Sequence, residues 1–343
     1  MNIKHYLGIK YKILSGNKKF SSEIYKNSNI FIFLAADYGN LGDVAITYAQ
    51  KEFLKDNFKD YNIVEVPLSN TMEYLKDIKR NIKSHDIITI VGGGNMGNIY
   101  ENYEELRRLV IKTFKNNFIV SFPQTIDFSN DSEGNKSLNK SKKIINKHKN
   151  ILVLAREQKS YEKMKKEFNC KVELVPDIVF SLKNKLNFGE IKRTENIGIC
   201  FRDDKEKNNG IEIYKDKIIK NIDNYEFFST YIGDDLIYEN RYVTLKKLLE
   251  KIATYRYIIT DRLHAMIFAY LTDTPCYFFD NSNKKISETY KTWLTKCKNI
   301  HEVKNFKYEE VYNCVIDKDE ENYFLNNKFN ELIAEIKKNI KEK

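Results

Sequence analysis

Short apolar runs alternate with longer, helix-like segments along most of this 343-residue chain. Segments with helical spacing lie between the runs, for example Gly42–Asn57 and Asn102–Asn116. Parallel strands need such crossover helices, which then cover both faces of the sheet. The alternation therefore predicts a doubly wound α/β fold. The first six candidate strands are Ile30–Ala36, Asn62–Val66, Asp86–Val91, Asn117–Phe122, Asn150–Ala155 and Lys171–Val175.

A polar, aperiodic stretch at Ser181–Glu195 interrupts the alternation, which then starts again. The later candidate strands are Ile197–Phe201, Glu226–Tyr231, Tyr257–Thr260 and Pro275–Phe279. Because the chain is long for one core, we expect two Rossmann-like domains that face each other across a cleft. The expected parts are a basic lead-in at 1–29, an N-terminal domain at 30–185, a C-terminal domain at 186–306 and C-terminal helices at 307–343.

Membrane, secreted and metal-binding classes find little support in the composition. No apolar run approaches the roughly 18–20 residues that cross a bilayer, and the N-terminus lacks a secretory signal pattern. The five cysteines are scattered and form no C-x-x-C pair, which is typical of reduced thiols in a cytoplasmic protein. No His/Cys cluster has metal-ligand spacing. We expect a cytoplasmic protein without a metal site.

The net charge of +10 is concentrated in two lysine-rich stretches. Six lysines precede Ser28, and six more lie between Lys136 and Lys149 without an acidic residue. Such patches can face nucleic acid, an anionic membrane surface or solvent. Because no aromatic residues interleave with the lysines, nucleic acid is the weakest of these interpretations. A solvated surface and a peripheral contact with an anionic membrane both stay open.

Two glycine-containing loops each stand between a candidate strand and a candidate helix: DYGNLGD at Asp37–Asp43 and VGGGNMGNIY at Val91–Tyr100. Glycine permits positive φ and close approach of a ligand, at the sheet edge where α/β folds bind ligands. Neither loop matches the Walker A or dinucleotide pattern, so each alone could be a structural turn. Two loops at one sheet edge favour a binding cleft. The candidate substrate-binding residues here are Asn40, Gly42, Asp43, Gly93, Gly94 and Asn95.

Further polar side chains follow other candidate strands, namely Gln124, Arg156, Asp177 and Arg202. One arginine at a strand end is more often an ion-pair partner than a ligand. Three arginines, at 156, 202 and 262, directly follow apolar strands in a chain that otherwise uses lysine heavily. This pattern favours planar, two-pronged recognition of carboxylate or phosphate.

The stretch Thr260–Phe279 combines a strand end with Arg262 and His264 at the start of an apolar helix. Backbone N–H groups and the helix dipole favour an anion at this position. His264 would then be a titratable base beside a cation and an anionic substrate. The alternative is a buried structural imidazole.

Seven motifs, taken in their order along the chain, resemble those of a known family. The ordered series is far more specific than any single motif. The motifs are DYGNLGDVAI, VGGGNMGNIYE, FPQTIDFS, LAREQKSYE, VPDIVFSL, FRDD and TDRLHAMIFAYLTDTPC, between about Ile30 and Leu294. This series resembles the polysaccharide pyruvyl transferases of the bacterial exopolysaccharide type. The resemblance implies a GT-B-like fold and transfer of pyruvate from phosphoenolpyruvate onto a sugar as a ketal, with release of phosphate. It also implies no redox cofactor, and a glycan or lipid-linked saccharide as acceptor.

The resemblance also implies roles for particular residues. Arg262, Leu263 and His264 match the family's R-L-H catalytic element, and Arg202 matches an arginine that holds the donor. His264 would be the general acid/base, while Arg262 and Arg202 hold the carboxylate and the departing phosphate. The match is looser for Arg156 and the glycine loops. We expect Arg107→Lys, on the helix after the second loop, to have a mild effect on donor binding.

Two other functions are compatible with the sequence. One is a nucleotide-sugar glycosyltransferase on the same fold, and the other is a non-catalytic partner in polysaccharide assembly. The presence of both Arg262 and His264 argues against the non-catalytic partner.

Overall fold

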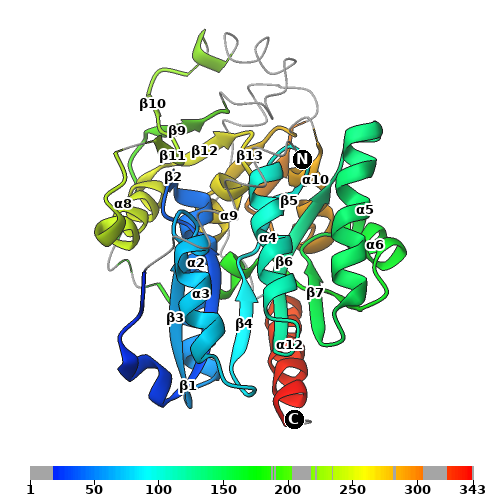
Figure 1. The fold of residues 1–343 in the computed structure, drawn as a ribbon. Coiled ribbons are helices and arrows are strands. Elements are labelled where there is room, and N and C mark those ends of the chain that lie inside the picture. The colour runs from blue at the N-terminus through cyan, green and yellow to red at the C-terminus, as the bar shows by residue number, and fades with distance from the viewer. Residues whose placement is uncertain are drawn as a thin grey trace. The chain divides into compact units, whose positions relative to one another are not determined.

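The computed structural model describes residues 18–186, 188, 191–202, 218–220, 222–233, 235–280, 283–303 and 323–341 (Figure 1). The chain forms two compact units. Unit 1 comprises Met1–Asp37, Ile46–Ile178 and Lys328–Lys343, and unit 2 comprises Tyr38–Ala45 and Val179–Asn327.

A parallel sheet forms the centre of unit 1. Its strands are β1 (Ser28–Ala35), β3 (Tyr61–Pro67), β4 (Ile87–Ile90), β6 (Phe118–Asp127), β7 (Ile151–Ala155) and β8 (Lys171–Leu174). They lie in the order β3-β1-β4-β6-β7-β8, and the short β5 (Gly93–Gly97) adds to β6. The path along the sheet reverses at β1, so the carboxyl ends of β1 and β4 form a topological switch point.

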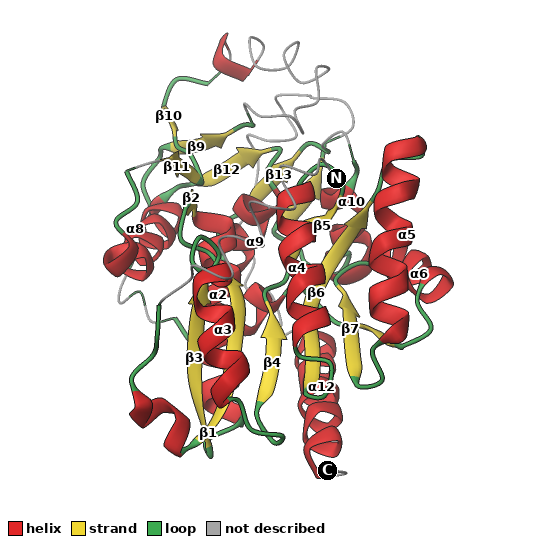
Figure 2. Ribbon diagram, viewed as in Figure 1, coloured by secondary structure: helices red, strands yellow, loops and turns green. Residues whose placement is uncertain are grey.

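Helices cover both faces of this sheet (Figure 2). One face packs against α3 (Thr71–Asn81), α4 (Glu101–Thr113), α5 (Ser132–Lys147) and α6 (Gln158–Glu167). The other face packs against α2 (Leu41–Asn57), where the ring of Phe53 lies 6.3 Å from that of Phe122. Phe329, on α12 (Tyr323–Lys341), also packs here, with its ring centroid 5.9 Å from that of Phe53. Double coverage explains why β1, β4 and β7 read as continuous apolar runs.

Unit 2 repeats this architecture with shorter strands. They are β9 (Ile197–Cys200), β10 (Tyr225–Phe227), β12 (Tyr257–Thr260), β13 (Cys276–Phe278) and β14 (Ile300–Glu302). Their order is β10-β9-β12-β13-β14 and all pairs are parallel, so the switch point lies between β9 and β12. The larger helices of this unit are α8 (Arg241–Thr254) and α9 (Leu263–Leu271), followed by α10 (Lys285–Thr289) and the π-helical turn η5 (Tyr290–Leu294).

A small antiparallel ribbon places residues 38–45 in unit 2, although they lie between two elements of unit 1 in sequence. The ribbon pairs β2 (Gly39–Asn40) with β11 (Tyr231–Gly233). A Cβ on Gly39 would lie 2.0 Å from the backbone oxygen of Gly233, so no side chain fits at this position. The division predicted at 185/186 leaves this segment in the N-terminal domain. The ribbon joins residues far apart in sequence, so the segment clusters with unit 2.

The predicted fold class, two Rossmann-like doubly wound units, is confirmed. Each predicted apolar run contains strand residues, and α2, α4 and α9 lie where helices were predicted. The prediction missed β2, β5 and β14, which are short and either glycine-rich or polar. The short 3-10 helices η1 (Ser22–Lys26), η2 (Ile178–Leu182) and η4 (Tyr238–Asn240) were also not predicted.

The structure describes part of each end of the chain. Within the basic lead-in, the Phe20 ring stacks on Tyr74 of α3 at 4.3 Å, and residues 1–17 lie outside the described residues. The predicted C-terminal helix is present as α12 from Tyr323, and residues 304–322 also lie outside the described part.

Candidate active site

The switch point of unit 2 brings together the ends of two adjacent strands. Cys200 of β9 is the register partner of Thr260 of β12, and the Thr260 hydroxyl donates to the Cys200 backbone oxygen at 2.6 Å. The next residues along the two strands include Arg202 and Arg262. Two of the arginines predicted to bind an anion therefore leave the sheet side by side.

Asp261 ties the two strand ends together. Its Oδ1 accepts the backbone N–H of Arg202 at 2.7 Å, and its Oδ2 accepts no hydrogen bond from the part of the chain that the structure describes. Burial is the largest influence on this carboxyl and raises its pKa, against the lowering effect of the Arg202 N–H and of the charges on Arg202 and Arg262. A buried carboxyl group thus lies near the charges of two arginines.

Arg262 precedes α9 as its N-cap residue, in an extended conformation. Its Nε donates to the Phe201 backbone oxygen and its Nη1 to the Thr230 hydroxyl, both at 3.4 Å, the long end of the hydrogen-bond range. Among the described residues, no carboxylate forms an ion pair with its guanidinium. The side chain is 9% exposed. The hydrogen bonds of the Arg262 guanidinium to described residues thus go only to neutral oxygens.

His264 is the second residue of α9 and packs directly on the first glycine loop. A Cβ on Gly42 would lie 2.3 Å from the His264 Nδ1, so the imidazole occupies the space that any other residue at 42 would fill. On its own helix, His264 lies 6.1 Å from the Phe268 ring, measured between centroids. Leu263, between the arginine and the histidine, is buried. The first loop and the R-L-H element thus meet within unit 2.

Hydrogen bonds within the first loop fix its shape. Asn40 accepts the Gly42 N–H at 3.0 Å through Oδ1 and donates from Nδ2 to the Asp43 carboxylate at 2.8 Å. The Tyr38 hydroxyl donates to the same carboxylate oxygen at 2.9 Å. The Leu41 N–H donates to the Thr230 backbone oxygen at 2.8 Å, so the residue that contacts Arg262 also holds this loop.

The second glycine loop belongs to unit 1 and is itself part of the sheet. Gly93 has φ +124°, a conformation that favours glycine, and it pairs in register with Gln124. Gln124 is fully buried and donates to the Val91 backbone oxygen at 2.6 Å. Its Oε1 has no hydrogen-bond partner among the described residues. Gly94 follows in the same strand and is partly exposed.

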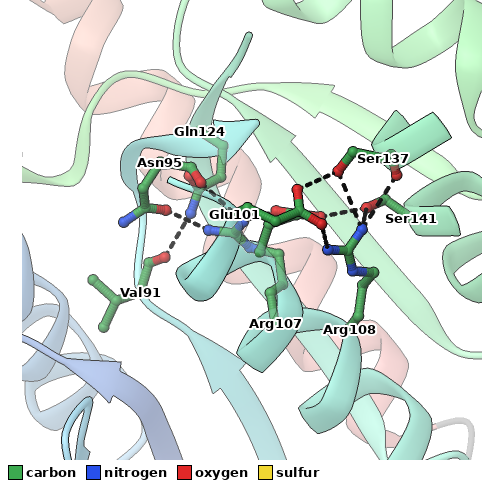
Figure 3. A network of polar contacts seen from close by, with 9 residues as sticks. Val91, Asn95, Glu101, Arg107, Arg108, Gln124, Ser137 and Ser141 are labelled. Carbon is green, nitrogen blue, oxygen red and sulfur yellow. Dashed lines mark hydrogen bonds and ion pairs between the residues drawn. The ribbon is translucent and has the colours of Figure 1, made fainter. Parts of the chain in front are cut away.

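A buried network holds this loop to the helices that cover the sheet (Figure 3). The fully buried Arg107 donates to Asn95 and to the Glu104 carboxylate. Its neighbour Arg108 bonds Glu101 and the Ser137 backbone oxygen of α5. The Arg107 guanidinium is an internal tie between α4 and the loop, so Arg107→Lys would disturb packing and cannot serve as a control for donor binding.

Arg156 and Asp177, both predicted to bind substrate, contact each other. The Arg156 Nη1 donates to the Asp177 carboxylate at 2.9 Å, and its Nε donates to the Thr125 hydroxyl at 2.7 Å. Both side chains are 1% exposed. This geometry is that of a buried ion pair and favours a structural or positioning role for Arg156.

Other chemistries have less support at these positions. In the described residues, no three His, Cys, Asp or Glu side chains are grouped as a metal site would need. Burial raises the pKa of the Cys200 thiol to about 11, which opposes the thiolate form needed for nucleophilic attack. None of the described helices has the length and apolar character needed to cross a membrane.

Sequence reasoning missed Thr230 and gave Asp261 no role at the site. Thr230 stands in a short loop after β10 and belongs to no motif, so only the fold reveals its contacts with Arg262 and Leu41.

Comparison with known proteins identifies the family of this chain. The family model described as polysaccharide pyruvyl transferase matches residues 40–283. General stress protein 30 of Bacillus subtilis is 34% identical over 274 residues, which cover 77% of this chain and 78% of that protein. Pyruvyl transferase 1 of Schizosaccharomyces pombe is 28% identical over 281 residues, which cover 76% and 68%.

A solved structure with a similar fold is UDP-GlcNAc 2-epimerase from Methanocaldococcus jannaschii. It has a TM-score of 0.55 at 12% identity and covers 90% of this chain and 98% of its own. At this identity the likeness concerns the fold alone. The family match covers Asn40–Asp43 of the first glycine loop, both arginines at the β9–β12 switch point and His264. This chain belongs to the polysaccharide pyruvyl transferase family.

Proposed function

We propose that this protein transfers pyruvate from phosphoenolpyruvate to two hydroxyls of a sugar in a surface polysaccharide or its precursor, forming a ketal and releasing phosphate. One observation carries the proposal. Arg262 and His264 occupy the start of α9 beside Arg202, at the switch point of a parallel sheet. Helix N–H groups and guanidinium forks together suit a small donor that carries both a carboxylate and a phosphate.

The reaction requires proton movements that one imidazole near neutral pH can serve. C3 of the enol gains a proton, which leaves C2 with oxocarbenium character. Two sugar hydroxyls bond to C2 and the C2–O bond to phosphate breaks. Of the two protons that the hydroxyls lose, one balances the proton gained at C3 and the other leaves with phosphate. We assign these transfers to His264, whose ring is held against Gly42.

The arginines supply electrostatic stabilisation. Arg262 has its guanidinium on neutral oxygens, so its charge is available to the donor's carboxylate and departing phosphate. We assign Arg202 to the same anion, with its backbone held by Asp261. Within unit 1, the loop residues Gly93, Gly94, Asn95 and Gln124 stay candidates for substrate binding. Arg156, whose backbone N–H donates to the Gln124 backbone oxygen, and its partner Asp177 would hold this region in place.

We further propose cytoplasmic action on a glycan or lipid-linked acceptor, with weak contact between α5 and an anionic membrane surface. Lys136, Lys140, Lys143 and Lys147 recur at the spacing of one helix face, and three of them are exposed while Lys140 is partly exposed. Lysines near an anionic leaflet contribute on the order of 1 kcal/mol each.

The test is incubation of the protein with phosphoenolpyruvate and a panel of saccharides, followed by mass spectrometry and phosphate assay. Pyruvyl transfer adds about 70 Da, the mass of pyruvic acid less water, and releases one phosphate for each product. A parallel panel of nucleotide sugars separates this activity from glycosyl transfer. Phosphate release without the added mass, or turnover of a nucleotide sugar alone, would refute the proposal.

A further inference from the structure

The β2–β11 ribbon presents an aromatic ring to solvent next to the candidate active site. Tyr231 begins β11 and is 56% exposed. At Gly233, the position of a Cβ lies 3.8 Å from the Tyr231 ring, and φ at this glycine is +57°. The ring therefore lies along a ribbon that has no other side chain at its glycine end. An exposed ring buries little apolar surface, so its contribution to folding is small.

Register places this ring on the same side of the ribbon as a polar cluster. Tyr231 is the direct partner of Asn40, and opposite residues of an antiparallel pair project from the same face. Asn40 bonds the Asp43 carboxylate, which also accepts the Tyr38 hydroxyl. An aromatic ring and a group of amide, carboxylate and phenol oxygens thus share one face.

Two short chains of contacts connect this face to the catalytic residues. Asn40 accepts the N–H of Gly42, on which the His264 imidazole packs. Thr230, the residue before Tyr231, accepts a hydrogen bond from Arg262. The ring and the proposed acid/base therefore belong to one corner of unit 2.

These groups have the chemistry of a sugar-binding surface. A pyranose ring has an apolar C–H face that stacks on an aromatic ring, and hydroxyls that pair with carboxylate and amide oxygens. Binding sites commonly combine an aromatic wall with a few convergent polar groups. We propose that Tyr231 is the stacking platform for the acceptor pyranose and that Asn40 and Asp43 bind its hydroxyls; this inference rests on the proposed pyruvyl transfer.

The donor fits this face poorly. Phosphoenolpyruvate is small and strongly anionic, and the Asp43 carboxylate would repel it. Arg202 and Arg262 supply the charge that it needs. The proposal therefore separates an acceptor side, formed by the ribbon, from a donor side, formed by the two arginines.

The chain offers a matched control in Phe227, which is 55% exposed. It lies on β10, the edge strand of the unit 2 sheet, with its ring 5.5 Å from that of Tyr225. Phe227 belongs to the same unit and is as exposed as Tyr231, but it is not part of the ribbon. Its removal tests whether any exposed aromatic ring has the same effect.

The test compares steady-state kinetics of Tyr231→Ala, Tyr231→Phe and Phe227→Ala. The acceptor is whichever β-methyl glycoside of galactose, glucose or N-acetylmannosamine gives the most ketal with the wild type. We expect Tyr231→Ala to raise the acceptor KM about tenfold or more, with the phosphoenolpyruvate KM within about twofold. Tyr231→Phe should keep most of the affinity, and Phe227→Ala should match the wild type. An unchanged acceptor KM in Tyr231→Ala, or an equal rise in Phe227→Ala, overturns the proposal.

A second measurement separates failure of this inference from failure of the proposed function. Saturation-transfer NMR with the same methyl glycosides detects sugar binding without turnover. The wild type can bind a sugar in this assay even if it forms no ketal. In that case, a signal that is present with the wild type and absent with Tyr231→Ala still supports the platform. Equal signals from both proteins, or none from the wild type, would overturn it.

Discussion

The two units share one strand order but use their arginines differently. In unit 1, Arg107 and Arg156 are buried and each contacts a carboxylate, Glu104 and Asp177 respectively. In unit 2, Arg262 contacts only neutral oxygens among the described residues and retains 9% exposure. An arginine that follows a strand can thus be an internal tie or a charge available to a ligand. The identity of its partner decides between these roles.

Electrostatics explains the difference. A buried ion pair roughly offsets the cost of removing two charges from water, and losing one partner leaves an unpaired buried charge. Arg262 sits where its charge has only weak partners, which is costly for the free protein and favourable once an anion binds. The variants below are ordered from the largest expected effect to the smallest, and each tests this contrast.

Removal of the imidazole should have the largest effect. We expect His264→Ala to lower kcat by roughly a hundredfold to ten-thousandfold, because proton transfer loses its acid/base. The free energy of unfolding should change little, because His264 is partly exposed at the start of α9. Phosphate release measured alongside chemical denaturation provides both values. Near-wild-type turnover in a folded variant would remove His264 from the mechanism.

Arg107→Ala tests the internal ties of unit 1. It leaves the buried Glu104 without its cation, so the free energy of unfolding should fall by about 3–5 kcal/mol. Arg262→Ala is the matched variant in unit 2 and should cost less than about 1 kcal/mol, since no ion pair is broken. Urea denaturation of both variants makes the comparison. Similar losses in the two proteins would mean that both arginines are structural.

Arg262→Lys and Arg202→Lys keep the charge but lose the planar two-donor fork. We expect each to weaken phosphoenolpyruvate binding roughly tenfold, with unfolding near that of the wild type. Arg80→Lys, at an exposed position on α3, serves as the control in place of the buried Arg107. Isothermal titration calorimetry measures all three. Equal donor affinities would contradict the assignment of both arginines to the anion.

The proposed membrane contact of the α5 lysine face is tested separately in unit 1. Replacing Lys136, Lys143 and Lys147 with glutamine should weaken sedimentation with anionic liposomes several-fold, and the binding should fade as salt rises. Lys142 is left intact because it pairs with Glu167 of α6 at 3.1 Å. A control variant changes the exposed Lys59, Lys79 and Lys115 instead. Equal losses in both triple variants, or binding to neutral liposomes, would leave α5 as a solvated surface.

Asp261→Asn should produce the smallest effect, and one that depends on pH. Burial raises the pKa of Asp261, so the folded state binds its proton more tightly than the unfolded state does. Its contribution to stability is therefore present below the unfolded pKa and is lost as pH rises through the folded pKa. Relative to the wild type, Asp261→Asn should be more stable at pH 7 than at pH 4. Denaturation curves at both values test this, and a difference that does not change with pH would contradict it.

The sequence predicted the fold well because most strands are buried on both faces and read as apolar runs. It failed for β2, β5 and β14, where pairing rather than composition defines the strand. For the site, Arg156 and Arg262 look alike in sequence, since each lies within two residues of the end of an apolar strand. Only the fold brings Asp177 to Arg156, and Thr230 to Arg262, so local sequence could not distinguish a tie from a ligand.

The position of residues 38–45 has a consequence for protein synthesis. About 190 residues separate Asn40 from its strand partner Tyr231, and the separation between Gly42 and His264 is larger still. At roughly 5–20 residues per second, the first loop leaves the ribosome about 10–40 s before β11 follows. The contact between His264 and Gly42 can therefore form only after most of the chain has been made. A truncated chain that ends before β11 cannot assemble this corner, even when the sheet of unit 1 is complete.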